Sequence, residues 1–534
     1  MKYKVCILAA GAGTRNSWSK DTNKALLPIK NRAAISWIID LYKDANEIVI
    51  AVGHNQKYLI DYLKIAHDED KIRIVKIKNF SKKGSGPGQS LLECKKYLQV
   101  PFISHACDSI CFYKLPKPNK NWIAYDIKNS DKHSYAVLES ENKIFFKNKK
   151  KFKNKKVFTG IAGINNFKLF WKNLEQNTFY SKKFSNHLYF EKQMLDGFYN
   201  LDKDTKLLKI KWHDIGNDLD YLKISYFAKK NRNIVLPKKK EFIFFEKGKV
   251  IKFFADKKIS DLRYKRAQII KSFMPQRLKI KSNYLYYPYV KGKILSSLSS
   301  KNIFLYVLKS LKKSLWKSKR LNKSQLKNFY NECLKFYKDK TFKRVKMFNK
   351  KINLDQYDFI NNKKVIPINK ILKKINWKKL QIGIPVNFHG DTALNNIIYS
   401  KKKITLIDWR ESFGKLLFYG DLYYDLAKIY HVLILPQFLN YGNNIRIKHN
   451  KKKIEFRFKK FENLENFLKI YDKFLQINNY DIKKIKLLSY LIFLNIAPLH
   501  DGKISKLFFL YGKLKLLEML DENKLFNGKG LFVF

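Results

Sequence analysis

Short, uninterrupted hydrophobic runs recur in the first hundred residues of the chain. Each run is bounded by polar or glycine-containing segments, and together they predict buried strands at 3–10, 46–53, 71–77 and 100–106. Segments with a helical spacing of apolar residues lie between them, as at 33–43 and 88–98. Alternating strands and helices predict a mostly parallel α/β sheet with crossover helices. Such sheets bind ligands at the carboxyl ends of their strands.

The pattern changes near residue 230. Residues 225–240 are basic, contain Pro237 and show no clear periodicity, which is typical of a domain boundary. We therefore predict an N-terminal domain at 1–230, a linker at 231–240 and a C-terminal domain at 241–534.

The C-terminal domain is expected to begin with strands and to continue with helices. Residues 241–255 form two short apolar runs around the turn EKGK, which predicts a β-hairpin. Lysine-rich segments with helical spacing follow at 256–273, 296–320 and 324–350. The remainder is predicted to be mostly helical, except for the stretch at 386–410.

The composition is that of a folded protein with more than one core. The chain has 534 residues, of which 45% are hydrophobic and 15% aromatic, and this length suggests about two to four domains. No apolar stretch of about 20 residues occurs, so no transmembrane helix is predicted. The five scattered cysteines fit reduced thiols, and the N-terminal apolar run is too short for a secretory signal. These features predict a cytoplasmic protein.

The formal net charge of +66 has two interpretations. A basic chain can bind nucleic acid or an anionic membrane surface. Alternatively, the excess reflects an AT-rich coding sequence, because nearly all of it is lysine spread along the whole chain and only about a dozen residues are arginine. We favour the second interpretation, and no nucleic-acid partner is predicted. The positive field would still attract anionic substrates.

Candidate chemistry appears first in the sequence LAAGAGTR, residues 8–15. Gly11 and Gly13 follow the first predicted strand, where glycines let backbone N–H groups approach a phosphate closely. Arg15 can hold phosphate oxygens in a bidentate manner. Lys24 lies nine residues later, directly before the apolar run ALLPI. This combination indicates a site for a phosphate group.

The strand, the glycine loop, the arginine and the KALLP segment resemble the sugar-nucleotidyltransferase (NTP transferase) family. The segments FISHACD, GSGPGQSLL and WHDIGNDLDYL resemble later motifs of that family, and the resemblance covers residues 3–225. It implies a Rossmann-like, GT-A type α/β fold in which Arg15 and Lys24 are catalytic. It implies nucleotide-binding roles for Ala10, Gly11, Gly13, Gly84 and Gly86. It also implies that Mg²⁺ is held by Asp108 and Asp214.

The reaction that this resemblance implies is the transfer of a nucleotidyl group. A phosphomonoester oxygen attacks the α-phosphorus of an NTP and pyrophosphate leaves, while the protein supplies positioning and charge neutralisation. Structural alternatives stay open for both aspartates. Asp214 also fits an Asx-turn in HDIGND, and Asp108 also fits a helix N-cap after a strand.

A second segment with candidate chemistry is FHGDTALNNIIYSKKKITLIDW, residues 388–409, which contains Asp391 and Asp408. Its first part has the spacing H-x-D-x-x-x-x-N, which includes Asp391 and Asn396, and predicts a loop. The run ITLIDW predicts a strand that delivers Asp408 to that loop. Phosphoryl transfer from ATP needs such a set, because one aspartate orients the attacking hydroxyl while an asparagine and a second aspartate hold Mg²⁺.

This constellation resembles the aminoglycoside phosphotransferase and choline kinase family, over about residues 241–515. The resemblance implies an α+β, protein-kinase-like fold. It makes Asp391 the catalytic base and assigns Mg²⁺ to Asn396 and Asp408. His389 is expected to support the loop rather than to react.

Three further residues receive roles from the same resemblance. Lys252, in the predicted hairpin, would bind ATP, while Asp421 and Asp425 would cap a helix and anchor the loop. The chain departs from the family at one point, because the family pairs the strand lysine with a glutamate on the next helix. Residues 262–285 contain no acid, and Asp261 is the nearest.

The two implied reactions fit end to end, because a kinase makes the phosphomonoester that a nucleotidyltransferase consumes. We therefore predict a bifunctional enzyme that uses ATP, a second NTP and Mg²⁺ to activate a small alcohol or sugar for a surface polysaccharide or lipid. Choline or another amino alcohol with CTP is favoured, because both families include choline-activating members, and a sugar or polyol is the rival. In the alternatives, the two activities are independent, or only one domain is active.

Overall fold

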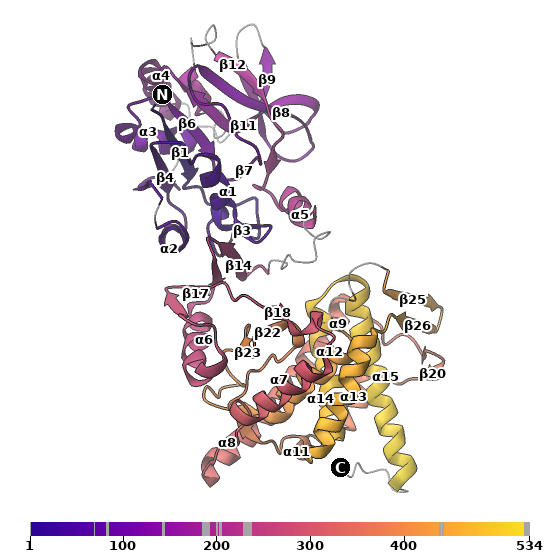
Figure 1. Ribbon diagram of the computed structural model, residues 1–534. Coiled ribbons are helices and arrows are strands. Elements are labelled where there is room, and N and C mark those ends of the chain that lie inside the picture. Colours follow the sequence, from indigo (N-terminus) through magenta and orange to yellow (C-terminus); the bar gives the residue numbers. More distant parts are fainter. Residues whose placement is uncertain are drawn as a thin grey trace. The chain divides into compact units, whose positions relative to one another are not determined.

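The computed structural model describes residues 2–68, 70–81, 85–140, 145–183, 193–198, 201, 205–227, 238–436, 439 and 443–527. It divides into two compact units (Figure 1). The first comprises Met1–Ser260 with Lys279–Tyr289, and the second comprises Asp261–Leu278 with Val290–Phe534. Most of the predicted linker, residues 231–237, lies outside the described residues.

The centre of the first unit is a parallel sheet in the order β6-β1-β4-β5. Its strands are β1 (Lys4–Ala9), β4 (Glu47–Val52), β5 (Ile72–Lys76) and β6 (Phe102–Ala106). These are the four strands that the hydrophobic runs predict. Val5 of β1 lies opposite Ile48 of β4 and Ile103 of β6, so the carboxyl ends of these strands meet at one edge.

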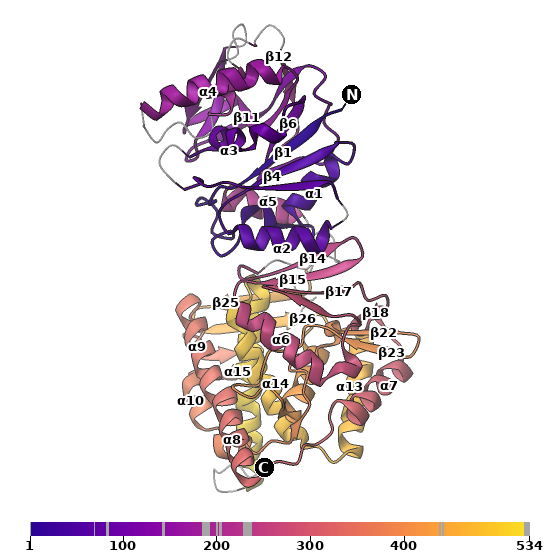
Figure 2. The ribbon, with the colours of Figure 1, turned by 90° about the vertical axis from the view of Figure 1, so that its left-hand side faces the viewer.

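The sheet continues beyond β6 with mainly antiparallel strands (Figure 2). Strand β11 (Phe152–Ile164) pairs antiparallel with β6 and also with β8 and β9. The other strands on this side are β8 (Asn121–Ser130), β9 (Tyr135–Ser140), β10 (Phe145–Lys149) and β12 (Thr205–Lys209). The sheet is therefore parallel around β1 and mixed beyond it.

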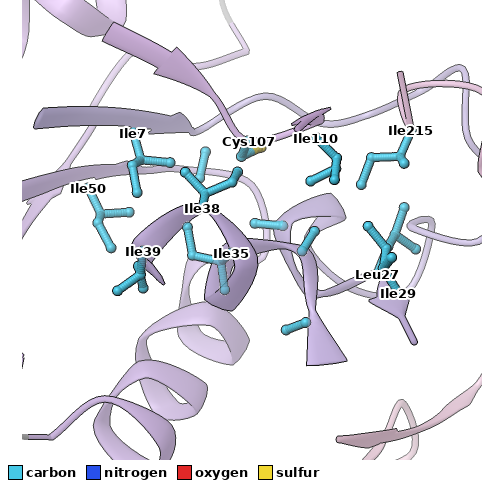
Figure 3. Packing of buried hydrophobic residues seen from close by; sticks show 14 of the residues in the cluster. Ile7, Leu27, Ile29, Ile35, Ile38, Ile39, Ile50, Cys107, Ile110 and Ile215 are labelled. Carbon is cyan, nitrogen blue, oxygen red and sulfur yellow. The ribbon is translucent and has the colours of Figure 1, made fainter. Parts of the chain in front are cut away.

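Alternate residues of β1 point to two different cores. Val5, Ile7 and Ala9 enter the core that contains helices α1 (Ala34–Leu41) and α2 (Gln56–Ala66). Cys6 and Leu8, with Ala10 directly after the strand, enter the core that contains α3 (Pro87–Cys94) and α4 (Phe167–Lys183). Both faces of the strand are buried, which explains its uninterrupted apolar sequence. Figure 3 shows Ile7 and Ile50 of the sheet packed against Ile38 and Ile39 of α1.

Several short elements complete the loops of the first unit. They are β2 (Pro28–Ile29), β3 (Arg32–Ala33), β7 (Ser109–Ile110), β13 (His213–Asp214) and α5 (Asp218–Phe227). The strands β7 and β13 pair antiparallel, and β2 and β3 form a small hairpin.

A separate four-stranded antiparallel sheet also belongs to the first unit. It consists of β14 (Glu241–Glu246), β15 (Lys249–Phe254), β17 (Tyr284–Pro288) and β16 (Lys279–Lys281). The first two strands are the predicted hairpin. Phe244 packs on Tyr62 of α2 with ring centroids 5.0 Å apart. Arg32 forms a bidentate ion pair with Glu246, with distances of 2.9 and 2.8 Å. This sheet therefore shares a hydrophobic core with the larger sheet that contains β1.

The second unit is mainly helical, as the sequence predicts. Helix α6 (Lys257–Ile269) leads into it, and a π-helical turn (Lys335–Asp339) joins α8 to α9. The remaining helices are α7 (Lys301–Ser314), α8 (Lys323–Leu334), α9 (Lys340–Lys351), α10 (Ile368–Lys373), α11 (Trp377–Leu380), α12 (Leu422–Ile434), α13 (Glu462–Ile477), α14 (Ile482–Ile496) and α15 (Gly502–Asn527). No helix in the described part of the chain is long and apolar enough to cross a membrane.

One part of the predicted helical remainder is wrong. Strands β25 (Ile445–Asn450) and β26 (Lys453–Phe458) form an antiparallel hairpin. Strand β26 also pairs with β19 (Phe359–Ile360), which in turn pairs with β20 (Lys363–Lys364). The physical reason is the alternation of buried Ile454 and Phe456 with exposed charged residues, which has the period of a strand and not of a helix.

Small strands position the second candidate site. Strands β18 (Lys293–Ile294), β22 (Ile397–Ser400) and β23 (Lys403–Leu406) form one sheet. Strands β21 (Pro385–Val386) and β24 (Gly420–Asp421) pair with each other. The loop with the H-x-D-x-x-x-x-N spacing runs between β21 and β22, and Asp408 follows β23.

Candidate functional site

The glycine loop after β1 is held in place from several sides. Gly13 has φ +63, and a Cβ atom there would lie 2.9 Å from Ser19 Oγ, so another residue would be strained at this position. A Cβ atom at Gly11 would meet nothing within 4 Å. Asn23 Nδ2 donates to the carbonyls of Ala9 and His54, at 2.9 and 2.8 Å. The loop is thus fixed at the carboxyl end of β1, with open space beside Gly11.

Lys24 and Asp108 form the central ion pair of this edge. Lys24 Nζ lies 2.5 Å from Asp108 Oδ2. Burial alone would lower the pKa of Lys24, but the charge of Asp108 and their hydrogen bond outweigh burial and raise it. Burial would raise the pKa of Asp108, and the charges of Lys24 and Arg15 bring it below its usual value. Both groups are therefore charged at neutral pH.

Asp214 is brought to the same place by the pairing of β7 with β13. Asp214 lies opposite Ser109, and Ile215 N donates to the carbonyl of Asp108 at 3.0 Å. A Cβ atom at Gly216 would lie 2.9 Å from Asp108 Oδ2, 2.9 Å from Asp214 Oδ1 and 3.8 Å from Arg15 Nη2. Both carboxylates and the arginine therefore converge around Gly216, which leaves no room for a side chain.

The alternative roles of the two aspartates, an Asx-turn for Asp214 and a helix N-cap for Asp108, differ in whether the structure shows them. Asp214 does form an Asx-turn, because its Oδ1 accepts from Gly216 N at 2.7 Å, and its Oδ2 accepts from Tyr135 Oη at 2.6 Å. Asp108 does not cap a helix, because strand β7 follows it. Its carboxylate is held by Lys24 instead.

Two converging carboxylates are suitable ligands for Mg²⁺, which prefers oxygen donors. Asp108 and Asp214 fit this requirement, and Gly216 leaves the space between them without a side chain. Neither the first nor the second candidate site has three or more clustered His, Cys, Asp or Glu side chains within the described residues. A cation here would therefore complete its coordination with substrate oxygens or water.

The remaining predicted residues of the first site are spread more widely. The carbonyl of Ala10 accepts from His54 N at 2.9 Å, next to the glycine loop. Gly86 precedes α3, and its carbonyl accepts from Ser90 N at 3.0 Å. Gly84 lies outside the described residues.

The second candidate site is a loop anchored by one buried carboxylate. Asp425 of α12 accepts from the backbone N–H groups of His389 and Gly390, at 2.8 and 2.7 Å, and from Trp316 Nε1 at 3.1 Å. Burial raises the pKa of Asp425 to about 6, although these hydrogen bonds oppose the shift. Asp421 caps α12 by accepting from Tyr423 N. The predicted roles of loop anchor and helix cap are thus confirmed.

Asp391 is held by a lysine and an amide. Its Oδ1 lies 2.7 Å from Lys428 Nζ, and its Oδ2 accepts from Asn396 Nδ2 at 3.1 Å. Burial would raise the pKa of Asp391, but the charge of Lys428 lowers it. The Asp391 side chain is 36% exposed, so a substrate can still reach it. Because Asn396 donates through Nδ2, its amide oxygen is the atom that could bind a cation.

Asp408 approaches the same loop from β23. Ile407 N donates to the carbonyl of Asn396, and Arg410 N donates to that of His389, both at 2.9 Å. Asp408 has φ 61, an uncommon conformation that aspartate tolerates better than most residues. Burial lowers the pKa of His389 to about 4, against the charges of Asp391 and Asp408. The structure therefore brings Asp391, Asn396 and Asp408 together.

His389 has the supporting role that the sequence suggests. It is buried, and its Nδ1 accepts from Asp391 N at 3.2 Å. The neutral ring thus fixes the backbone of the aspartate. Asn396 and Asp408 supply further oxygen donors at this loop, a donor set that fits Mg²⁺.

Helix α6 supports the loop through Arg266, a residue that the sequence did not indicate. The buried guanidinium donates to the carbonyls of Phe388 and Leu417. The backbone carbonyl of Arg263 accepts from Trp409 Nε1 at 2.7 Å. Lys252 is buried in β15, opposite Ile243 and Leu285. Its predicted ATP-binding role stays a prediction.

Comparison with known proteins finds a similarity in the part of the chain that contains the first site. Residues 5–138 match the model of a family described as the MobA-like NTP transferase domain. The N-terminal part of the chain is therefore similar to an NTP transferase domain. This match includes the glycine loop, Lys24 and Asp108, and it agrees with the predicted nucleotidyltransferase fold. A search of curated proteins by sequence found no match.

Several solved structures are similar to part of the chain. The CTP:phosphocholine cytidylyltransferase from Streptococcus pneumoniae is 18% identical with a TM-score of 0.36, covering 42% of this chain and 99% of its own. A UDP-glucose pyrophosphorylase in complex with UDP-glucose is 18% identical with a TM-score of 0.34, covering 43% and 100%. The inositol-1-phosphate CTP transferase from T. maritima is 17% identical with a TM-score of 0.32, covering 44% and 98%.

Proposed function

We propose that the chain is a bifunctional enzyme. Its C-terminal part phosphorylates a small alcohol with ATP, and its NTP transferase domain couples the resulting phosphomonoester to a second NTP with release of pyrophosphate. CTP is the favoured second nucleotide. The acceptor is an amino alcohol, a polyol or a sugar, and the product serves surface polysaccharide or lipid head-group synthesis. The convergence of Asp391, Asn396 and Asp408 on one loop supports the kinase assignment.

In the phosphoryl-transfer step, Asp391 accepts the proton of the attacking hydroxyl, because its carboxylate is ionised and partly exposed. Asn396 and Lys428 fix the orientation of that carboxylate, and Asp425 fixes the backbone of the loop. Asn396 and Asp408 would hold Mg²⁺, which neutralises phosphate charge when bound. The mechanism relies on positioning and charge neutralisation.

In the nucleotidyl-transfer step, backbone N–H groups of the loop at Gly11 and Gly13 bind the NTP phosphates, and Arg15 and Lys24 neutralise their charge. Asp108 keeps Lys24 charged and oriented. Asp108 and Asp214 would hold Mg²⁺, which would neutralise phosphate charge. The phosphomonoester oxygen forms a bond to the α-phosphorus of the NTP as the bond from that phosphorus to pyrophosphate breaks.

The rival is a fusion of two unrelated activities or a chain with one active domain. The rival and the proposal differ in which compounds produce ADP and pyrophosphate. Purified full-length protein would be incubated with ATP, CTP, UTP, GTP, Mg²⁺ and a panel of alcohols and sugars, and both products followed.

The sequential reaction predicts that one alcohol yields both ADP and pyrophosphate. Asp391→Ala should then stop both products, and adding the phosphomonoester should restore pyrophosphate alone. Asp108→Ala should stop only pyrophosphate. Products that arise from unrelated compounds, or only one product under every condition, would contradict the coupled pathway.

A further inference from the structure

Four basic side chains gather around Asp391 in the second unit. Lys428 pairs with Asp391 directly. Lys340 and Arg344 lie one turn apart on α9, and Arg410 follows Asp408 in the chain. The Phe336 ring joins two of them, because Lys340 Nζ lies 4.2 Å and Arg410 Cζ lies 5.1 Å from its centroid. Tyr424 of α12 completes the group, 5.5 Å from Lys340 Nζ.

Arg410 lies directly against the catalytic loop. A Cβ atom at Gly390 would lie 2.7 to 2.8 Å from three carbons of the Arg410 side chain, and Gly390 has φ +85. Only glycine therefore allows this close approach beside Asp391. The Nε atom of Arg410 is buried and has no hydrogen-bond partner among the described residues. A buried donor without a partner is costly, and a ligand oxygen would satisfy it.

The positive charge of this cluster is not balanced within the described residues. Lys428 forms an ion pair with Asp391. Among the described residues, Lys340, Arg344 and Arg410 have no carboxylate within ion-pair distance. Burial and the neighbouring cations lower the pKa of Lys340 and of Arg344. The like charges therefore repel one another in the protein without a ligand, which raises its free energy. A bound anion would offset this repulsion.

The backbone is also unusual at this place. The turn that carries Phe336 is π-helical and ends at Asp339, directly before Lys340. Such turns are rare within α-helices, and many of those that occur lie at functional sites. Phe336 stacks on Phe413 with ring centroids 4.4 Å apart. The irregular turn thus joins the cations of α9 to the segment that follows Asp408.

We propose that Lys340, Arg344 and Arg410 form a subsite for an anionic group beside Asp391, and that the acceptor alcohol carries this group as a carboxylate, phosphate or phosphonate. The inference rests on the proposed kinase function and specifies its substrate class. The resemblance assigns ATP binding to Lys252 and Mg²⁺ to Asn396 and Asp408, which leaves these cations for the acceptor. A purely cationic alcohol such as choline is disfavoured by the same charges.

The chemical step remains balanced with an anionic acceptor. The acceptor hydroxyl oxygen forms a bond to the γ-phosphorus of ATP, and its proton goes to Asp391. The bond between the γ-phosphorus and the bridging oxygen breaks, and ADP leaves with those electrons. The anionic group of the acceptor takes no part in bond exchange and only positions the hydroxyl.

Matched acceptors test the proposal. Glycerol, glycerate, glycerol 3-phosphate and choline would each be offered to the full-length protein with ATP and Mg²⁺, and ADP measured. An anionic acceptor should exceed glycerol in kcat/KM by at least about tenfold, the effect of one charge-assisted hydrogen bond. Equal or better turnover of glycerol or choline would overturn the proposal.

Charge-removing variants identify the residues. Arg344→Gln and Lys340→Gln should raise KM for the anionic acceptor by about 10- to 100-fold and leave KM for ATP nearly unchanged. Lys346→Gln, on the exposed side of the same helix, is the matched control and should change neither. A rise in KM for ATP instead would assign the cluster to the nucleotide.

Calorimetric titration with inorganic phosphate, without ATP, separates this proposal from the proposed function. We expect a binding component that Arg344→Gln removes and that Asp391→Asn strengthens, because the latter removes the negative charge that pairs with Lys428. If this component is found while no alcohol is phosphorylated, the anion subsite stands and the kinase function fails. If no such component exists, the subsite is refuted, whatever the kinase activity.

Discussion

The two candidate sites share one arrangement but reach it by different routes. In the first, Asp108 pairs with Lys24 at 2.5 Å, and in the second, Asp391 pairs with Lys428 at 2.7 Å. In each pair, the charge of the lysine keeps the carboxylate ionised although the carboxylate is partly buried. A buried histidine precedes each aspartate, and burial lowers the pKa of both His105 and His389 to about 4.

The difference lies in where the lysine comes from. Lys24 belongs to the same loop motif as Gly13 and Arg15, and the side chain of Asn23 caps the short turn that carries it. Lys428 lies on α12, outside the H-x-D-x-x-x-x-N spacing that marks its partner. Both members of the first ion pair therefore lie in sequence motifs, although 84 residues separate Lys24 from Asp108. In the second pair, only Asp391 lies in a motif.

The largest predicted effect tests whether the two sites are chemically separate. Asp391→Asn should lower ADP formation by about 10²- to 10⁴-fold, the usual contribution of a general base, and leave pyrophosphate release from added phosphomonoester unchanged. Asp108→Asn should have the opposite pattern. Both products would be measured for both variants. A variant that lowers both rates equally would mean that the sites are not independent.

The second-largest predicted effect tests whether the four-stranded sheet of β14, β15, β17 and β16 is packed into the core of the first unit. Phe244→Ala should lower the free energy of unfolding of the first unit by about 3–5 kcal/mol, because the ring is fully buried against Tyr62. The control is Phe245→Ala, a neighbour on the other face of β14 that is only partly buried. Denaturant unfolding would be followed by the loss of pyrophosphate release. Equal effects of the two variants would contradict the shared core.

A smaller effect compares the two lysines. Lys24→Met and Lys428→Met should each lower the rate of their own reaction by about 10- to 100-fold, the value of one charged hydrogen bond. Lys428→Arg should recover part of the loss, because it keeps a charge near Asp391. The two product assays provide the measurement. If Lys428→Met is fully active, the ion pair does not position Asp391.

The smallest effect concerns pH and stability. The folded-state pKa of His105 is about 4, below the unfolded value near 6.5, because burial disfavours its charged form. The unfolded chain therefore binds the proton first, and stability present above about pH 6.5 is lost as pH falls towards 4.

For His105 alone, the loss between pH 7.5 and 5.5 should be about 1 kcal/mol. Denaturant unfolding at the two pH values would measure it. His105→Gln should show a smaller loss over the same interval. An identical loss in the variant would place the pH dependence elsewhere.

The sequence was most informative where structure is local. The apolar runs predicted β1, β4 and β6, because a strand buried on both faces has an uninterrupted hydrophobic sequence. They also predicted β5, but this strand lies at the edge of the sheet and is only partly buried. The hairpin of β14 and β15 was predicted for a similar reason, from a turn between two apolar runs. The hairpin of β25 and β26 was missed, because its apolar residues alternate with polar ones and form no uninterrupted apolar run.

The sequence by itself determined the motif residues: the glycine loop with Arg15 and Lys24, and the loop with Asp391 and Asn396. Only the tertiary structure decided what surrounds them. Lys428, Arg266 and the cations of α9 come from helices far along the chain, and no spacing rule connects them to the motifs. The physical reason is that a motif records contacts within a single turn or loop, whereas burial and charge at a site depend on every element packed against it.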